Sequence, residues 1–212
     1  MLTRVKELQQ FLKDKGQNLS VDGILGNQTM AAVGNYVRLS LKALNYALPN
    51  KAQIVYIRTD YTLTNTFDDF GVLYEQGAIK QVFNCSTTAG RYWVMNPVTV
   101  GGITGTAIVA ENQIVKDGYT FVSNSNWKTL WLGMPYFQQT SPFRIYRDGD
   151  KDNLIGTKIT TRGMYGTNAH HSGWGSFIDR WSAGCLVTPA NDWTNVIKSF
   201  KNGDKMDLVL IG

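Results

Sequence analysis

The sequence predicts a short all-α region at residues 1–48, followed by a mostly β domain with one or two helices at residues 53–212. Three observations support this reading. Apolar residues recur at helical spacing in the first region, and short runs rich in β-branched and aromatic residues dominate the second. A polar, proline-led stretch, 49–52, lies between them, and we expect a linker there.

The composition is typical of a globular protein that binds an anionic partner. Of 212 residues, 43% are hydrophobic and 17% charged, and 21 Lys and Arg against 16 Asp and Glu give a net charge of +5. The chain shows no basic run, zinc-ligand spacing or helix-turn-helix pattern, so we expect no nucleic-acid partner. An acidic polymer such as the bacterial cell wall fits the charge better. No apolar run approaches the roughly 18 residues that span a bilayer.

Two helices are predicted in the N-terminal region. The first carries an apolar face and ends at Gly16. The residues of that face are Val5, Leu8, Phe11 and Leu12. The second is capped by Asn27 and ended by Pro49, as one long helix or two abutting ones. Its apolar positions are Met30, Val33, Val37, Leu41, Leu44 and Leu48.

The loop between these helices carries a family motif. Leu8-Gln9 on the first helix, then Val21-Asp22-Gly23-Ile24-Leu25-Gly26 and Thr29, resemble the small three-helix peptidoglycan-binding domain. Asn27 departs from the family, which often has proline at that position. The resemblance implies an independent wall-binding module. Its implied wall-binding residues are Asp22, Gly23, Gly26 and Thr29.

The C-terminal domain is predicted from short strands. These are 54–57, 72–74, 79–83, 106–109, 143–147, 158–161 and 206–211, with a helix at 192–200. Asp148, Asp150 and Asp152 alternate as in a calcium loop. However, Asn153 stands where that loop needs glycine and Ile159 where it needs glutamate. We therefore interpret this stretch as a hairpin turn and expect neither a metal nor another cofactor.

The chemistry-bearing residues are concentrated near residue 170. The chain has two histidines, His170 and His171, and two cysteines, Cys85 and Cys185. A thiol acts as a nucleophile when an imidazole takes its proton, so we interpret Cys185 as the nucleophile and His170 as its base. A structural cysteine with two surface histidines is the alternative reading. Cys85 ends an apolar run, so we expect it to be buried rather than bonded to Cys185.

The same region resembles a known enzyme family. Gly166-Thr167-Asn168-Ala169-His170 followed by Trp181-Ser182-Ala183-Gly184-Cys185 resembles the signature of the L,D-transpeptidase catalytic domain. The stretches 85–97, 105–108 and 146–153 resemble the same family. The resemblance implies a β-sandwich or barrel fold, and it implies Cys185 as nucleophile and His170 as base. Ser182 and Gly184 are implied to shape the oxyanion hole and orient the imidazole.

Two departures concern the substrate end of the site. The family has a second histidine where this chain has Ala183, and an arginine where it has Val187. His171 could replace the missing histidine, but adjacent strand residues face opposite sides, so only one of the two histidines can face Cys185. We expect it to be His170, from its place in the family-like motif after Gly166-Thr167-Asn168-Ala169. The candidate substrate-binding residues are His171, Trp174, Trp181, Arg91 and Tyr92, although Arg91 and Tyr92 could equally serve in packing.

The predicted function is acyl transfer on wall stem peptides through a Cys185 thioester. A backbone carbonyl is expected as the third member of the triad, with Asp179 a weaker candidate. Two alternatives remain: a phage-type endolysin or L,D-peptidase that hydrolyses the same peptides, and an inactive wall-binding module. We expect a monomer that acts on peptidoglycan at the bacterial cell wall. The chain opens on a polar stretch rather than a signal peptide, which indicates either phage-encoded release or a trimmed chain.

Overall fold

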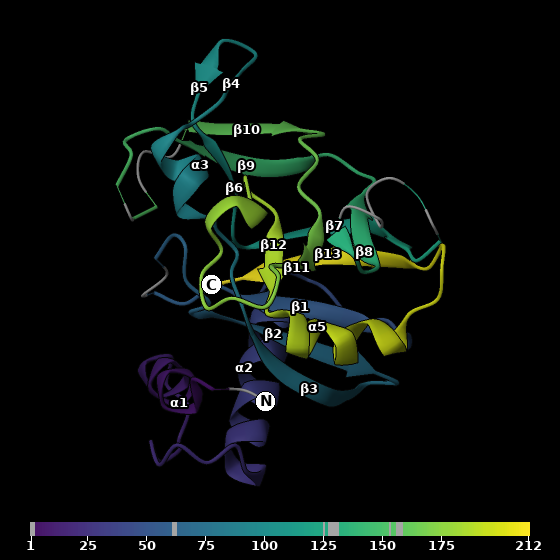
Figure 1. The fold of residues 1–212 in the computed structure, drawn as a ribbon. Helices are drawn as coiled ribbons and strands as arrows, with labels where there is room; N and C mark the ends of the chain where they lie inside the picture. Colours follow the sequence, from purple (N-terminus) through teal and green to yellow (C-terminus); the bar gives the residue numbers. More distant parts are fainter. Residues whose placement is uncertain (1–2, 61–62, 125, 127–131, 153, 156–158) are drawn as a thin grey trace.

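The computed structural model describes residues 3–60, 63–124, 126, 132–152, 154–155 and 159–212. Two helices come first, and a mostly β region follows (Figure 1). The helices are α1 (Val5–Asp14), α2 (Asn27–Ala43), α3 (Arg91–Met95) and α5 (Ala190–Val196), with 3-10 turns η1 (Asp179–Trp181) and η2 (Ile197–Ser199). The mostly β fold predicted from the sequence is confirmed.

Eight strands form the main sheet, in the order β12-β11-β8-β7-β13-β1-β2-β3. Their bounds are β1 (Gln53–Ile57), β2 (Asp69–Glu75), β3 (Ala78–Cys85), β7 (Gln113–Val122), β8 (Tyr136–Gln139), β11 (Ala169–His171), β12 (Leu186–Thr188) and β13 (Lys205–Ile211). Ser86 follows β3 and exchanges two backbone hydrogen bonds with Val187 of β12, at 2.8 and 2.9 Å. These bonds join the two edge strands, so the sheet is nearly closed into a barrel.

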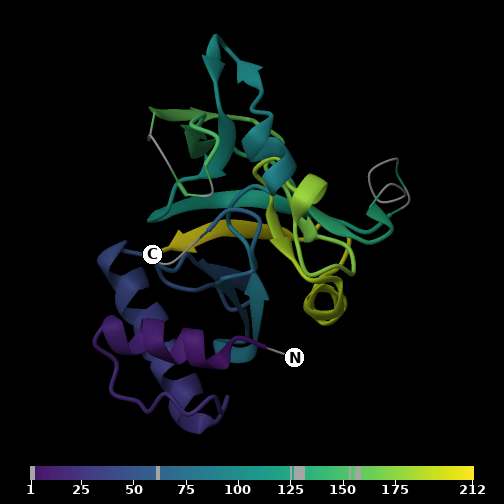
Figure 2. The same ribbon diagram turned by 60° about the vertical axis from the view of Figure 1, so that its left-hand side comes forward.

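A second, three-stranded sheet lies at the end of the barrel away from α1 and α2 (Figures 1 and 2). It consists of β6 (Thr106–Val109), β9 (Phe143–Asp148) and β10 (Ile159–Gly163). A hairpin of β4 (Thr99–Val100) and β5 (Ile103–Thr104) projects beyond it. The hairpin turns on Gly101 and Gly102, whose φ values of +61° and +78° favour glycine.

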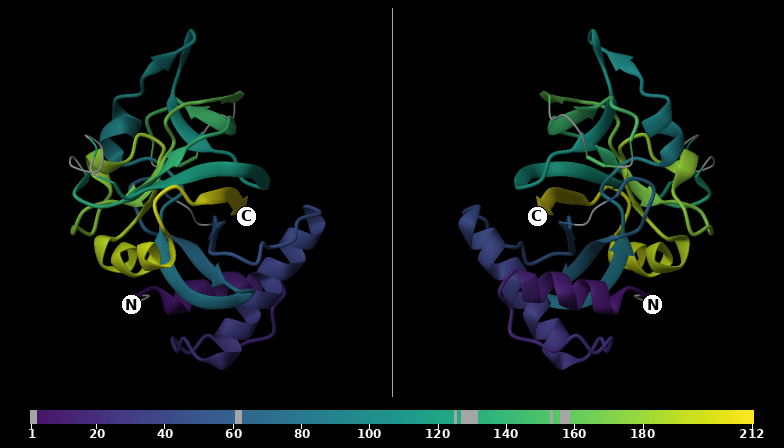
Figure 3. Two further views of the ribbon diagram at one scale, coloured as in Figure 1. Left: turned by 90° about the vertical axis from the view of Figure 1, so that its right-hand side faces the viewer. Right: turned by 90° about the vertical axis from the view of Figure 1, so that its left-hand side faces the viewer.

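The two faces of the sheet border two different apolar clusters. In β1, Ile54 and Tyr56 join the barrel interior with side chains such as Phe137 and Trp193. Val55 and Ile57 alternate with them and join a second cluster, which contains the buried residues of α1 and α2. The helices therefore cover the outer face of β1 and its neighbouring strands (Figure 3). The division into residues 1–48, 49–52 and 53–212 stays a prediction, but the first and last of these parts share one apolar layer.

The two helices predicted from the apolar spacing are present in the N-terminal region, with three differences in detail. The resemblance implied a three-helix domain, whereas the structure has two helices between residues 3 and 48, with the Val21–Leu25 stretch in a loop. The second helix ends at Ala43 rather than at Pro49. The apolar spacing continues past that end because Leu44 and Leu48 still pack against the sheet. In addition, Gly26 rather than Asn27 is the N-cap residue.

All seven predicted strands are present, but Lys158 of the run 158–161 lies outside the described residues, as does Asn153 of the predicted turn. The helix predicted at 192–200 consists of α5 and η2, beginning at Ala190. Strands β4, β5, β7, β8 and β12 were not predicted, whereas a strand at His170 and His171, now β11, was assumed when their side chains were placed on opposite sides. In β7 the pair Asp117-Gly118 is typical of a turn, yet it forms a bulge opposite the register shift between Met206 and Leu208.

Candidate active site

His170 and Cys185 are brought together by two adjacent strands. Strand β11 pairs in parallel with β12, with His170 opposite Val187, and the Leu186 N–H donates to the Asn168 carbonyl at 2.9 Å. Cys185 directly precedes β12 and is two residues from Val187, so alternation places both on one face. His170 and Cys185 therefore project to the same side of neighbouring strands.

The ring of His170 is held in one tautomer. It is buried, and its Nδ1 lies 2.6 Å from the backbone carbonyl of His171. A carbonyl oxygen can only accept, so Nδ1 carries the hydrogen, and Nε2 is the ring nitrogen that can take up a proton. The predicted backbone carbonyl behind the base is thus that of His171. Asp179, the weaker candidate, is an exposed residue of η1.

His171 uses both ring nitrogens for structure. Its Nε2 lies 2.5 Å from the Leu132 carbonyl, and its Nδ1 accepts the Gly173 N–H at 2.9 Å. These partners require a hydrogen on Nε2 and none on Nδ1, which is the neutral form. Burial lowers the pKa of His171 further. His171 therefore holds the loop after β11, and its two bonds leave no ring nitrogen to replace the family's second histidine.

The turn before the cysteine depends on Ser182 and Gly184. Ser182 is fully buried, and its hydroxyl accepts the Gly184 N–H at 3.1 Å and donates to the Cys185 carbonyl at 2.8 Å. Gly184 has φ +128°, and a Cβ there would lie 2.3 Å from the Ala107 carbonyl oxygen, so only glycine fits. The Gly184 N–H donates to the Ser182 hydroxyl in this conformation, and the part of these two residues in shaping an oxyanion hole stays a prediction.

The two thiols differ in their surroundings. Cys185 is half-buried, donates to the Gly166 carbonyl at 3.6 Å, and packs against the cluster of Phe67, Ile178 and Val187. Cys85 is buried in the barrel interior, as predicted. Burial raises the pKa of Cys85 well above its ordinary value, so it stays a protonated thiol. Both cysteines are free.

One flank of the site is formed by α3 and η1. The Gly90 N–H donates to the Ser182 carbonyl at 2.9 Å, and the Trp93 indole donates to the Arg180 carbonyl at 3.0 Å. The Arg180 guanidinium lies 4.3 Å from the centre of the Tyr92 ring. Tyr92 is therefore engaged in packing beside the turn, whereas the neighbouring Arg91 is exposed.

The loop after β11 carries the two candidate tryptophans. Trp181 packs over this loop: its ring centre is 5.2 Å from that of His171, and a Cβ on Gly173 would touch its indole at 2.8 Å. Trp174, in contrast, is 71% exposed. Of the two, Trp174 is the one whose ring is available to a ligand.

Three of the four candidate wall-binding residues converge on Gln9 of α1, while the fourth, Gly26, is the N-cap residue of α2. Its amide nitrogen donates to Asp22 Oδ1, Thr29 Oγ1 and the Ile24 carbonyl at 2.7, 2.9 and 3.1 Å, and its oxygen accepts the Gly23 N–H at 2.7 Å. Gln9 is 1% exposed. The conformation of this loop is therefore fixed by one buried amide, and its role in wall binding stays a prediction.

The two departures at the substrate end have structural consequences. Val187 is fully buried and pairs with Ser86 where the edge strands of the main sheet meet. An arginine there would bring a charge into an apolar cluster, so the family's arginine has no room in this arrangement. Ala183 is exposed beside the cysteine, where the family has its second histidine.

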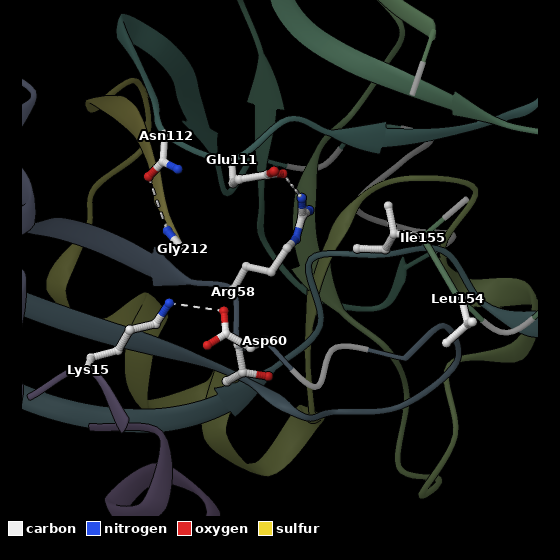
Figure 4. A pocket seen from close by; sticks show the side chains of 9 residues that line it. Lys15, Arg58, Asp60, Glu111, Asn112, Leu154, Ile155 and Gly212 are labelled. Carbon is white, nitrogen blue, oxygen red and sulfur yellow. Dashed lines mark hydrogen bonds and ion pairs between the residues drawn. The ribbon is translucent and has the colours of Figure 1, made fainter. Parts of the chain in front are cut away.

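A charged cavity lies between α1 and the barrel, away from the cysteine (Figure 4). Lys15 pairs with Asp60 at 3.0 Å, and buried Arg58 pairs with Glu111 at 2.7 Å. Since these cations and carboxylates neutralise one another, the cavity is not an obvious site for an anion. The Lys15–Asp60 pair instead fastens α1 to the segment after β1.

Some groups around Cys185 were not predicted as site groups. They are the carbonyls of Gly166 and Ala107, the Gly90 N–H and the side chain of Phe67. Three are backbone groups, which carry no side-chain signal, although Gly166, Gly90 and Ala107 all lie inside the stretches that resemble the enzyme family. Phe67 lies in a polar loop that gives no periodicity.

Comparisons with known proteins gave a family model for the N-terminal region and a similar solved structure. Residues 3–54 match the family model described as "Predicted Peptidoglycan domain", which confirms the predicted peptidoglycan domain at the N-terminus. The chain is also similar to the crystal structure of an L,D-transpeptidase from Xylanimonas cellulosilytica, with 17% identity and a TM-score of 0.32. That similarity covers 98% of this chain and 92% of the other. No curated protein sequence matches.

Among the described residues, no helix combines the length and the apolar character needed to cross a membrane. The same residues contain no group of three or more His, Cys, Asp or Glu side chains arranged to hold a metal ion.

Proposed function

We propose that this protein is a cysteine enzyme that acts on the stem peptides of peptidoglycan. The observation that carries the proposal is the parallel pairing of β11 with β12, which directs His170 and Cys185 to the same side. The match of residues 3–54 to a peptidoglycan domain supports the polymer as partner and the cell wall as the place of action.

The proposed reaction begins with proton transfer from the Cys185 thiol to Nε2 of His170. The thiolate adds to a peptide carbonyl of the stem, and the C–N bond breaks as the leaving amine takes the proton from Nε2. The product is a thioester on Cys185. The His171 carbonyl, 2.6 Å from His170 Nδ1, stabilises the imidazolium that forms in between. The Ser182 hydroxyl keeps the turn that presents the sulfur.

The second half of the reaction decides between a transferase and a hydrolase. An acceptor amine that attacks the thioester gives a cross-link, whereas water gives a shortened peptide. We place transfer first. Hydrolysis is the second candidate because Val187 and Ala183 replace the two family residues at the acceptor end. An inactive wall-binding module is the third.

Purified muropeptides separate these functions. After incubation, mass spectrometry should show either new cross-linked dimers, for a transferase, or loss of residues or cross-links, for a hydrolase. With wild-type protein, a mass adduct should map to the peptide that contains Cys185, and Cys185→Ala should abolish both adduct and turnover. Cys85→Ala is the matched control and should keep them. An adduct on Cys85, or unchanged muropeptides with a folded wild-type protein, would overturn the proposal.

A further inference from the structure

A groove near the candidate site lies between the N-terminal segment and the β region. It is a cavity of about 550 Å³, here called the seam cavity. Thr3 and Arg4 line it from the N-terminal side, and Asn84 at the end of β3 lies across from them. Phe67, Trp174 and Asn191 line it from the side of the β region. Cavities of this size hold small organic ligands.

The two walls of the seam cavity are fastened to each other. The Thr3 N–H and hydroxyl donate to Asn84 Oδ1 at 3.0 and 3.3 Å, and the Asn84 amide nitrogen donates to the Phe67 carbonyl at 3.3 Å. Thr3 belongs to the stretch that matches a peptidoglycan domain, whereas Asn84 belongs to the barrel. The cavity is thus formed jointly by the two parts of the chain and is preformed.

The seam cavity is also close to the proposed nucleophile. Phe67 lines the cavity and belongs to the apolar cluster against which Cys185 packs. Trp174 lies three residues after His171, on the loop that the His171–Gly173 bond holds. The Gly173 carbonyl accepts the Ala190 N–H at 3.2 Å, which ties this loop to the start of α5 beside Asn191. A polymer lying in the cavity would therefore border the apolar cluster against which Cys185 packs.

The lining has the chemistry that recognises a sugar. An exposed indole offers a flat apolar face on which the C–H face of a pyranose can stack, while amides and hydroxyls bind its hydroxyl and acetamido groups. Trp174, which is 71% exposed, supplies the indole face. Asn191 supplies an amide and Thr3 a hydroxyl. Arg4, the cation of the lining, is already paired with Glu7 at 3.3 Å, which disfavours a strongly anionic ligand.

We propose that the seam cavity binds the N-acetylated sugars of the glycan strand, with Trp174 as the stacking platform. The inference rests on the proposed function, because it names the part of peptidoglycan that this cavity would take. It predicts that the enzyme distinguishes stem peptides that carry their disaccharide from peptides without it.

The test measures sugar binding apart from catalysis. The full chain is titrated with the tetrasaccharide of N-acetylglucosamine by isothermal calorimetry, and thermal melting verifies that each variant is folded. Trp174→Ala should weaken binding about tenfold or more, and Asn191→Ala should weaken it less. Phe177→Ala is the control, because Phe177 is 65% exposed on the same loop but does not line the cavity. It should bind as wild type does.

The outcomes separate this inference from the proposed function. The KM of the wild type should be lower for disaccharide-peptide than for the sugar-free peptide, and Trp174→Ala should reduce that difference. If wild type turns over muropeptides but does not bind the tetrasaccharide, or if Trp174→Ala binds as tightly as Phe177→Ala, the inference is wrong while the enzyme function stands. Tetrasaccharide binding that depends on Trp174 in a protein without turnover would overturn only the enzyme function.

Discussion

His171 Nδ1 accepts a 2.9 Å hydrogen bond from the Gly173 N–H, whereas Nδ1–H of the neighbouring His170 donates to the backbone carbonyl of His171. Two adjacent imidazoles thus have opposite tautomers. In His171 the unprotonated nitrogen is occupied by a backbone donor, whereas in His170 the nitrogen able to accept a proton is Nε2. The sequence argument for His170 as the base depended on its place in the family-like motif and on strand alternation, and the hydrogen bonds add a chemical reason.

The two histidines should therefore respond differently to substitution. His170→Ala should shift the pH midpoint of Cys185 alkylation by iodoacetamide towards that of a free thiol, about 8.5, and slow acylation by orders of magnitude. His171→Ala should leave the midpoint within a few tenths of a unit and should instead loosen the loop that carries Trp174. The measurement is the alkylation rate against pH for wild type and both variants. A shifted midpoint in His171→Ala alone would reverse the assignment.

Gln9 should control the fold of the Val21–Thr29 loop. Because its buried amide bonds four groups, Gln9→Ala should lower the free energy of unfolding by about 2 kcal/mol. Gln9 is also the main cause that lowers the pKa of Asp22, so the variant should raise that pKa. Carbon-detected NMR titration of the Asp22 carboxyl measures it. Gln10→Ala, one residue along the helix and bonded only to exposed Asp14, is the control and should change neither quantity. An unchanged pKa of Asp22 in Gln9→Ala would show that the loop keeps its conformation without Gln9.

The sequence predicted individual elements better than their packing. Ile54-Val55-Tyr56-Ile57 is a continuous apolar run, which is typical of a strand covered on both faces. That pattern indicated that something packs on the outer face of β1, yet it did not say that α1 and α2 do so. The apolar stripe of α1 fitted a separate helical module equally well, because a stripe shows that a face is buried and not against what.

The candidate site could be proposed from the sequence where it consists of side chains. His170, Ser182, Gly184 and Cys185 were singled out because reactive and small residues occur there in a recognisable order. The backbone pairing of Ser86 with Val187 could not be predicted, because backbone N–H and C=O groups are the same for every residue type except proline. The direction of the Gly184 N–H was missed for the same reason: the sequence names the serine but does not show that its hydroxyl accepts that amide.

The shared apolar layer predicts that the helices and the barrel unfold together. Phe11 is fully buried, lies 5.3 Å from the Tyr36 ring in an edge-to-face contact, and belongs to the cluster that covers β1. Phe11→Ala should cost about 3–5 kcal/mol and should lower a single melting transition seen by both far-UV and tryptophan signals. Leu39→Ala on α2, which is 45% exposed, should have little effect. Two separate transitions in the wild type would show that the helical region is an independent unit.

Asp68 should make stability depend on pH. Burial, together with the neighbouring charge of Asp69, raises the pKa of Asp68 to about 6, above its ordinary 3.8. Between these two pH values the folded protein binds more protons than the unfolded chain does, so this group's contribution to the free energy of unfolding falls as pH rises through that window. It is constant above the folded pKa, and the total change is at most about 3 kcal/mol.

Asp68→Asn removes that titration while its carboxamide oxygen can still accept the Leu63 N–H, which Asp68 holds at 2.7 Å. Urea unfolding of both proteins from pH 4 to pH 7 should show the variant gaining stability relative to wild type as pH rises, with the gain complete just above pH 6. Asp150→Asn, at an exposed carboxylate of the turn after β9, should track wild type throughout. A stability difference between Asp68→Asn and wild type that is the same at pH 4 and pH 7 would mean that the Asp68 carboxyl titrates as it does in the unfolded chain, despite its burial beside Asp69.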